Sequence, residues 1–151
     1  MNTTIYKPKT TEMVICERKR ELIRIASPKD VFVALKQFHG KRQENFLVLT
    51  LDGAHQVIGI RIVTTGILNR TLVHPREVYS YAIIDNAAGI VVAHNHPSNC
   101  LTPSSEDVEV TQRLKAAGEI LGIPLLDHII FSKDGYLSFV ERGIFDSSGL
   151  A

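Results

Sequence analysis

The sequence predicts an α/β domain in which a mixed sheet is flanked by helices. Helical segments alternate with short apolar strand segments along the chain, in the order helix, strand pair, helix, strand, helix, strands. The segment from Phe46 to Leu51 is apolar on both faces, which is typical of a strand buried at the centre of a sheet. With 151 residues and 44% hydrophobic content, the chain is long enough for one domain with a substantial core.

The first helix is predicted over residues 28 to 39, because Ser27 is a suitable N-cap and Gly40 is a natural end for a helix. The residues before it are polar and weakly patterned. We therefore divide the chain into an N-terminal arm, residues 1–26, and one domain, residues 27–151.

Two strands and a second helix are expected next. Asp52-Gly53 marks the turn between the buried strand and a segment at 57–63 that alternates apolar and other residues. The helix should begin near Pro75, with Gly89 just past its end. Its core-facing side chains are predicted to be Val78, Ala82 and Ile83.

The rest of the domain is predicted to continue the alternation. A third strand at 90–96 leads through a loop into a third helix that ends at Gly122. Two short strands should then flank the turn Lys133-Asp134-Gly135. Active sites in such sheets tend to lie at the carboxyl ends of strands, and the segment 90–96 ends in two histidines.

Charge and hydropathy argue against a nucleic-acid-binding, secreted or membrane protein. The net charge of +1 gives no general sign of a nucleic-acid or membrane-surface partner. We interpret the basic cluster of Arg18, Lys19, Arg20 and Arg24 as a solvated face. The N-terminus lacks the apolar core of a signal peptide, and no stretch approaches the roughly 20 apolar residues of a membrane helix. Cys16 and Cys100 make no C-x-x-C motif. We expect a cytoplasmic protein with no membrane partner.

The segment AHNHPSNCLTPSSED, residues 93–107, holds the candidate site. His94 and His96 stand two positions apart at the end of a strand, so their side chains should project to the same face. Two imidazoles at this separation can bind one zinc ion, while Asn95 between them should point the other way. The pair therefore indicates a metal site.

The third helix should add a carboxylate to this pair. Its apolar stripe has helical spacing and comprises Val110, Leu114, Ala117 and Leu121. The same spacing continued backwards reaches Asp107 and then Ser104, which should therefore face inward at the start of the helix. Two histidines and one carboxylate leave one coordination position for water, as in catalytic zinc sites.

A purely structural interpretation of the same residues stays open at this point. Ser104 and Asp107 have the spacing of a capping box, and Thr102 before Pro103 is another acceptable N-cap. A single histidine at such a place is more often structural than a ligand. The convergence of a histidine pair and an inward carboxylate favours the metal site, because nothing else nearby would balance that buried charge.

The combination His94-x-His96-Pro97 followed by Ser104-x-x-Asp107 resembles the signature of the JAMM (MPN+) metalloproteases. The surrounding segments "TGILNRTLVHPREVYSYAI" and "GEILGIPLLDHIIF" resemble the RadC family, a bacterial branch of that superfamily. The resemblance runs from about residue 27 to residue 143. It implies a JAMM/MPN fold, similar in outline to cytidine deaminase, and Zn²⁺ held by His94, His96 and Asp107.

The resemblance also implies an activity and two further site residues. It implies hydrolysis of a peptide or isopeptide bond in a peptide or protein substrate. Ser104 would hydrogen-bond the oxyanion of a tetrahedral intermediate. Glu44, which leads the segment "ENFLVL", would be the general base and acid. Glu44 lies two positions before Phe46, so the two side chains should point to the same face of the strand. The alternative base, Glu77, stands where the first turn of a helix favours an acid.

Three features qualify the resemblance. Asn99 stands where the family usually has glycine, and Cys100 is unusual beside it. His128 and His74 match family positions, and we interpret both as structural. RadC proteins often carry a helix-hairpin-helix DNA-binding region for which this chain has no room, so the DNA repair label of the family applies less strongly.

The alternative function is a non-catalytic protein- or DNA-associated scaffold module of a repair or mobile-element system.

Overall fold

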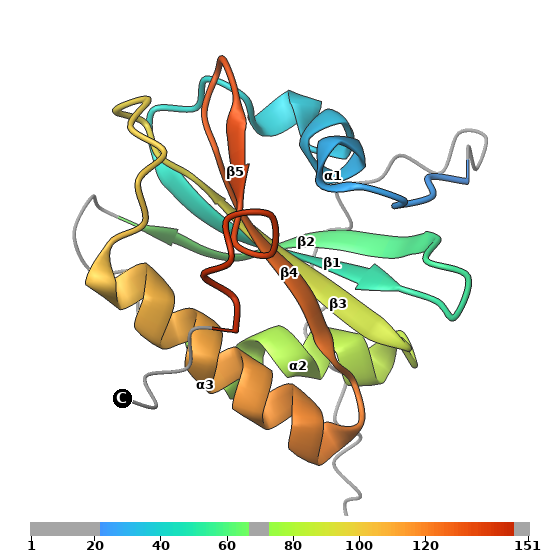
Figure 1. Ribbon diagram of the computed structural model, residues 1–151. Helices are drawn as coiled ribbons and strands as arrows, with labels where there is room; N and C mark the ends of the chain where they lie inside the picture. Colours follow the sequence, from blue (N-terminus) through green and yellow to red (C-terminus); the bar gives the residue numbers. More distant parts are fainter. Residues whose placement is uncertain (1–21, 67–72, 147–151) are drawn as a thin grey trace, which may run out of the picture.

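The computed structural model describes residues 22–66 and 73–146, which form a five-stranded sheet with helices on both faces (Figure 1). The strands are β1 Glu44–Leu51, β2 Val57–Gly66, β3 Gly89–Asn95, β4 Leu125–Phe131 and β5 Tyr136–Ser138. The helices are α1 Pro28–Ala34, α2 Pro75–Ile84 and α3 Ser105–Leu121. In the sheet order β2-β1-β3-β4-β5, β3 and β4 are parallel and the other neighbours are antiparallel, so the predicted mixed sheet is confirmed.

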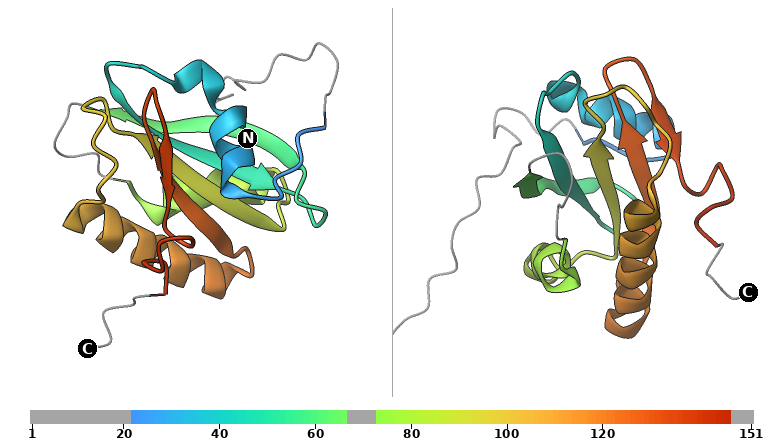
Figure 2. Two further views of the ribbon diagram at one scale, coloured as in Figure 1. Left: turned by 45° about the horizontal axis from the view of Figure 1, so that its top comes forward. Right: turned by 90° about the vertical axis from the view of Figure 1, so that its left-hand side faces the viewer.

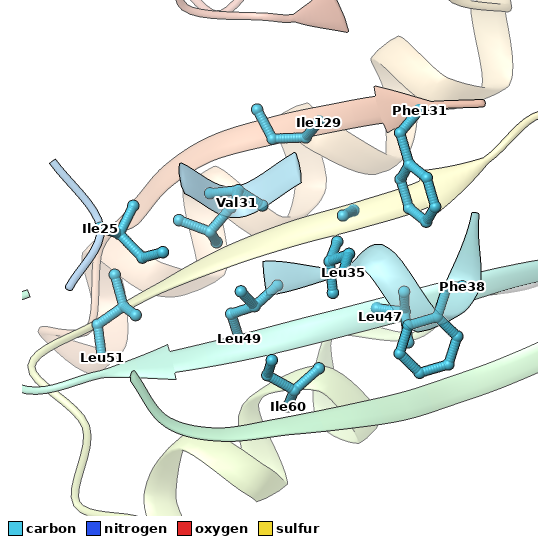
Figure 3. Close-up of a cluster of buried hydrophobic side chains, with 12 residues drawn as sticks. Ile25, Val31, Leu35, Phe38, Leu47, Leu49, Leu51, Ile60, Ile129 and Phe131 are labelled. Atoms are coloured by element: carbon cyan, nitrogen blue, oxygen red, sulfur yellow. The ribbon is translucent and has the colours of Figure 1, made fainter. Parts of the chain in front are cut away.

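The helix α1 covers one face of the sheet. Figure 3 shows Val31, Leu35 and Phe38 packed over the side chains that β1 directs to this face, such as Leu47 and Leu49. Each of these five residues is at most 5% exposed. The alternate residues of β1 point to the opposite face, so the strand is buried on both sides, as its apolar composition predicts.

The helices α2 and α3 lie on the other face (Figure 2). Phe46 and Val48 of β1 pack with them. The hydroxyl of Tyr79 in α2 donates a hydrogen bond to the Leu114 carbonyl of α3 at 2.9 Å. A Cβ at Gly118 would collide with Tyr79, so this glycine permits the close approach of the two helices.

The first helix is shorter than predicted. It ends at Ala34, and a 3₁₀ turn follows over Lys36–Phe38. The tighter turn places Leu35 and Phe38 three residues apart on one side, and both are buried against the sheet. Burial of two large side chains at this spacing accounts for the change of helix type.

Three details of the other helices were predicted wrongly. Ile83 is 58% exposed, because Tyr79 occupies the face of α2 that meets α3. Gly89 is the first residue of β3, and α2 ends at Ile84. Leu121 is 46% exposed, because the fully buried positions of α3 are Thr111, Leu114 and Gly118. The buried stripe of α3 is therefore rotated relative to the predicted one.

Only the end of the predicted N-terminal arm belongs to the described residues. Ile23–Ile25 runs beside the β1–β2 turn, where the Ile25 amide donates to the His55 carbonyl at 2.9 Å. The interpretations of Cys16 and of Arg18–Arg20 concern residues outside the described ranges. No helix within those ranges is long and apolar enough to cross a membrane.

Candidate metal centre

Four side chains meet at the carboxyl end of β3: Glu44, His94, His96 and Asp107. One ligand atom from each lies within 4.8 Å of all the others. The Nε2 atoms of His94 and His96 are 2.8 Å apart. Asp107 Oδ1 lies 3.2 Å from His94 Nε2, and its Oδ2 lies 3.4 Å from His96 Nε2. Glu44 Oε1 lies 3.8 Å from His94 Nε2. The predicted ligands therefore share one site with the predicted base.

The strand geometry places the histidines as the sequence predicts. His94 and His96 project to one side, while the side chain of Asn95 points to the other and is buried there. Asn95 Oδ1 accepts the amide of Asn45 at 2.7 Å, and its Nδ2 donates to the Gln43 carbonyl at 2.9 Å. These two bonds hold the backbone on both sides of Glu44. Asn95 thereby positions Glu44 at the site.

Asp107 both caps α3 and faces the histidines. Its Oδ2 accepts the backbone N–H of Ser104 at 2.8 Å, and the Ser104 hydroxyl accepts the backbone N–H of Asp107 at 3.1 Å. This is a capping box with aspartate at the third helical position. The capping box fixes the rotamer that carries the carboxylate to the histidines. The capping interpretation is therefore confirmed, and it is compatible with a carboxylate that faces a metal site.

The histidines are held so that their Nε2 atoms face the cluster. His96 Nδ1 donates to the backbone carbonyl of Cys100 at 2.6 Å. His94 Nδ1 lies 2.8 Å from Nε2 of His128. When Nδ1 carries the proton, as the carbonyl of Cys100 requires for His96, the lone pair lies on Nε2. Hydrogen bonds of this kind at the second ring nitrogen orient metal-binding histidines.

His128 links one candidate ligand to another through a chain of hydrogen bonds. Its Nδ1 lies 2.5 Å from the Thr111 hydroxyl, which donates to the Asp107 carbonyl at 2.7 Å. Each hydrogen bond in this chain has one donor and one acceptor if His94 Nδ1 donates to His128 Nε2 and His128 Nδ1 donates to the Thr111 hydroxyl. Burial lowers the pKa of His128 well below its ordinary value. A neutral His128 can accept that first hydrogen bond.

The carboxylate of Asp107 stays ionised at this site. Burial opposes its charge, but hydrogen bonds with His94 and His96 hold the pKa of Asp107 well below its usual range. Burial also opposes the charge on His96, yet the hydrogen bonds to Asp107 and Cys100 raise its pKa. The cluster therefore combines ionised oxygen with imidazole nitrogen, and this donor set could hold a divalent metal ion.

The structure distinguishes the two rival glutamates. Glu44 belongs to the cluster, and it shares the face of β1 that carries Phe46. Glu77 is exposed in the first turn of α2 and is not part of the cluster.

Asn99 has a φ of +62°, the left-handed conformation expected at a position where glycine is usual. Cys100 contributes its carbonyl to the site, and its side chain is exposed.

Sequence reasoning missed the roles of His128, Thr111 and Asn95. His128 was interpreted as structural, and it is fully buried in β4, but its ring also contacts His94. A histidine within an apolar strand was the available signal. Its meaning depends on β4 lying beside β3, with His94 opposite Ile130 in parallel register. No local pattern in the sequence fixes that neighbour.

Comparison with known proteins agrees with this geometry. Residues 25–144 match the family model described as RadC-like JAB domain. A UPF0758 protein of Methanospirillum hungatei is 52% identical over 127 residues, which are 83% of this chain and 56% of the relative. A UPF0758 protein of Pelobacter propionicus is 49% identical over 131 residues, 84% of this chain and 56% of the relative. The chain thus spans a little over half the length of these curated relatives.

Proposed function

The chain belongs to the family of RadC-like JAB domains, and from this premise we propose that it is a zinc-dependent hydrolase that cleaves a peptide or isopeptide bond. The observation that carries the proposal is the convergence of two Nε2 atoms and two carboxylates on one point at a strand end. One of the carboxylates, that of Glu44, would move a proton in the proposed reaction.

The ligand spacing supports zinc. Tetrahedral zinc with bonds of about 2.0–2.1 Å holds its ligand atoms about 3.4 Å apart. Asp107 Oδ1 lies 3.2 Å from His94 Nε2 and its Oδ2 lies 3.4 Å from His96 Nε2, close to that spacing. The two Nε2 atoms are 2.8 Å apart and would have to separate to reach it. We assign His94, His96 and Asp107 as the ligands. A bound zinc ion would act as a Lewis acid and would make a hydroxide nucleophile available near neutral pH.

Glu44 would carry the proton between the two halves of the reaction. Its carboxylate takes a proton from the attacking water, whose oxygen forms a bond with the carbonyl carbon. The bond from that carbon to nitrogen then breaks, and Glu44 delivers the same proton to the departing amine. With 18% of its side chain exposed, Glu44 is reachable by water and substrate.

Ser104 would stabilise the oxyanion by donating a hydrogen bond from its hydroxyl group. The oxygen of this hydroxyl accepts the Asp107 amide at 3.1 Å, and Ser104 is exposed at the start of α3. Replacing Ser104 with alanine should therefore lower kcat by about 100-fold, and the lost cap should lower stability by about 1 kcal/mol.

Metal analysis and a cleavage screen test the proposal together. Protein purified without chelator should hold about one zinc ion per chain, and His96→Ala should hold none. Wild type should cleave members of peptide and isopeptide libraries. Glu44→Gln should keep its zinc and lose hydrolysis, because the amide keeps the shape of the side chain and cannot accept the proton.

Three outcomes would count against the proposal or part of it. A wild-type protein that cannot be loaded with zinc would contradict the ligand assignment. A zinc-loaded protein that cleaves neither library would favour the non-catalytic scaffold module instead. Loss of zinc in Glu44→Gln would make Glu44 a ligand, and the assignment of the base would then be wrong.

A further inference from the structure

A basic pocket adjoins the candidate metal centre. It has a volume of about 240 Å³, and His96 forms part of its wall. Three cationic side chains, Lys41, Arg42 and Lys133, also line it. None of the described residues that line the pocket is acidic. The pocket and the candidate metal centre therefore have one residue in common, His96.

The walls of the pocket come from three separate connections. These are the segment before β1, the loop after β3 and the turn between β4 and β5, which lie together at one end of the sheet (Figures 1 and 2). Asn95 joins two of them, because its Nδ2 also lies 3.3 Å from the Lys41 carbonyl. Gly40 and Asn99 adopt left-handed conformations where the walls bend. The same Asn95 therefore orients both Glu44 and one wall of the basic pocket.

The three cations carry charge that the described residues do not balance. Lys41, Arg42 and Lys133 are exposed, and none of them forms an ion pair within residues 22–66 and 73–146. The side chain of Lys133 passes about 4.0 Å from the point where a Cβ on Gly40 would stand, so it lies over the segment that carries Lys41. Ammonium and guanidinium groups arranged in this way suit a carboxylate.

We propose that this basic pocket binds an acidic side chain of the peptide substrate, next to the bond that is cleaved. The inference rests on the proposed function for the position of the bond. A compact carboxylate fits the observations better than a nucleic-acid backbone does. The cations surround one small hollow and the chain has a net charge of only +1, whereas nucleic-acid binding favours an extended basic surface.

Binding can be tested without hydrolysis. The probes are two blocked tripeptides, acetyl-Gly-Glu-Gly-amide and acetyl-Gly-Gln-Gly-amide, added to the zinc-loaded full chain at low salt and followed by NMR. The glutamate peptide should shift the backbone amides of Lys41, Asn99 and Lys133 in a saturable way. The glutamine peptide should bind at least about fivefold more weakly, since it lacks the charge.

A matched pair of variants identifies the cations that matter. In the triple variant Lys41→Gln/Arg42→Gln/Lys133→Gln, the preference for the glutamate peptide should disappear. The control Lys29→Gln/Arg76→Gln/Arg113→Gln removes the same charge from exposed positions elsewhere and should keep the preference. The triple variant retains the zinc ligands. If the glutamate peptide binds through the metal and not through the pocket, its preference over the glutamine peptide will survive in this variant.

Cleavage gives the second measurement. In peptide libraries fixed in turn as glutamate or glutamine at each position, wild type should prefer glutamate at one position by about fivefold or more. The triple variant should lose that preference. Equal binding of the two tripeptides, or a preference that survives in the triple variant, would overturn the inference. So would tighter pocket binding by a ten-nucleotide oligothymidylate. If no library is cleaved, the proposed function fails while the binding measurement still decides the pocket.

Discussion

Two polar clusters lie on the same face of the sheet, toward opposite ends of β1. The first is the metal cluster, Glu44, His94, His96 and Asp107. The second is the ion-pair cluster, in which Asp85 Oδ1 accepts Arg61 Nη2 at 2.7 Å and Asp85 Oδ2 accepts the Thr50 hydroxyl at 2.6 Å. Both lie at the edge of the apolar layer between the sheet and the helices α2 and α3. Both contain ionisable side chains that are mostly buried.

The two clusters differ in how their charge is balanced. In the ion-pair cluster a guanidinium faces a carboxylate, and the two side chains are 8% and 9% exposed. In the metal cluster two carboxylates face two imidazoles whose Nδ1 atoms are already engaged. Buried charge needs a partner. The comparison indicates that the ion-pair cluster is complete within the chain, whereas the metal cluster is suited to a cation from outside.

The largest expected effect comes from breaking the complete cluster. Asp85→Ala leaves the buried guanidinium of Arg61 without its partner, so the free energy of unfolding should fall by about 3–5 kcal/mol. Urea unfolding measures this change. The double variant Arg61→Met/Asp85→Leu should recover most of the loss, since an apolar pair of similar volume replaces the ions. If the double variant is as unstable as Asp85→Ala, the unpaired charge is not the cause.

Zinc should have the second largest effect, and only through the metal cluster. At a free zinc concentration a thousandfold above Kd, wild type should gain about 4 kcal/mol of stability. His96→Ala should gain little, whereas Arg61→Met/Asp85→Leu should respond like wild type. Thermal unfolding with and without zinc provides the test. An equal response in His96→Ala would mean that zinc stabilises the protein elsewhere.

A smaller effect is expected from the hydrogen bonds behind the metal cluster. His128→Leu removes the acceptor for His94 Nδ1, and zinc affinity should fall by about 10–100-fold. His128→Gln offers an amide oxygen in a similar place and should restore part of the affinity. Competition with a chelator measures both. If the two variants bind zinc equally weakly, His128 contributes packing alone.

The smallest effect concerns pH. Burial opposes the charge on Asp85, but hydrogen bonds from Arg61 and Thr50 lower its pKa below the usual 3.8. The unfolded chain then binds more protons near that pH, so the contribution is present above about 3.9 and is lost as pH falls through the lower folded value. Acid titration of unfolding should show wild type losing more stability than Arg61→Met/Asp85→Leu. Parallel acid curves would contradict this.

The sequence predicts the local parts of the metal cluster. The spacing of two in a strand places His94 beside His96, and the helical spacing brings Asp107 inward at the start of α3. It also predicts the elements, although Leu121 and Ile83 show that a helix face can be rotated by its neighbours. Tyr79, which contacts α3, decides which side of α2 is covered.

The sequence by itself determined the element order, the histidine pair and the inward carboxylate, because each follows from a repeat of two or 3.6 residues within one segment. Only the tertiary structure decided that Glu44, Asn95 and His128 belong to the same site. β1 and β4 flank β3 in the sheet, so residues 50 positions before and 34 positions after His94 come to lie beside it. Strand order and register arise from packing between distant segments, so the local periodicity of the sequence does not predict them.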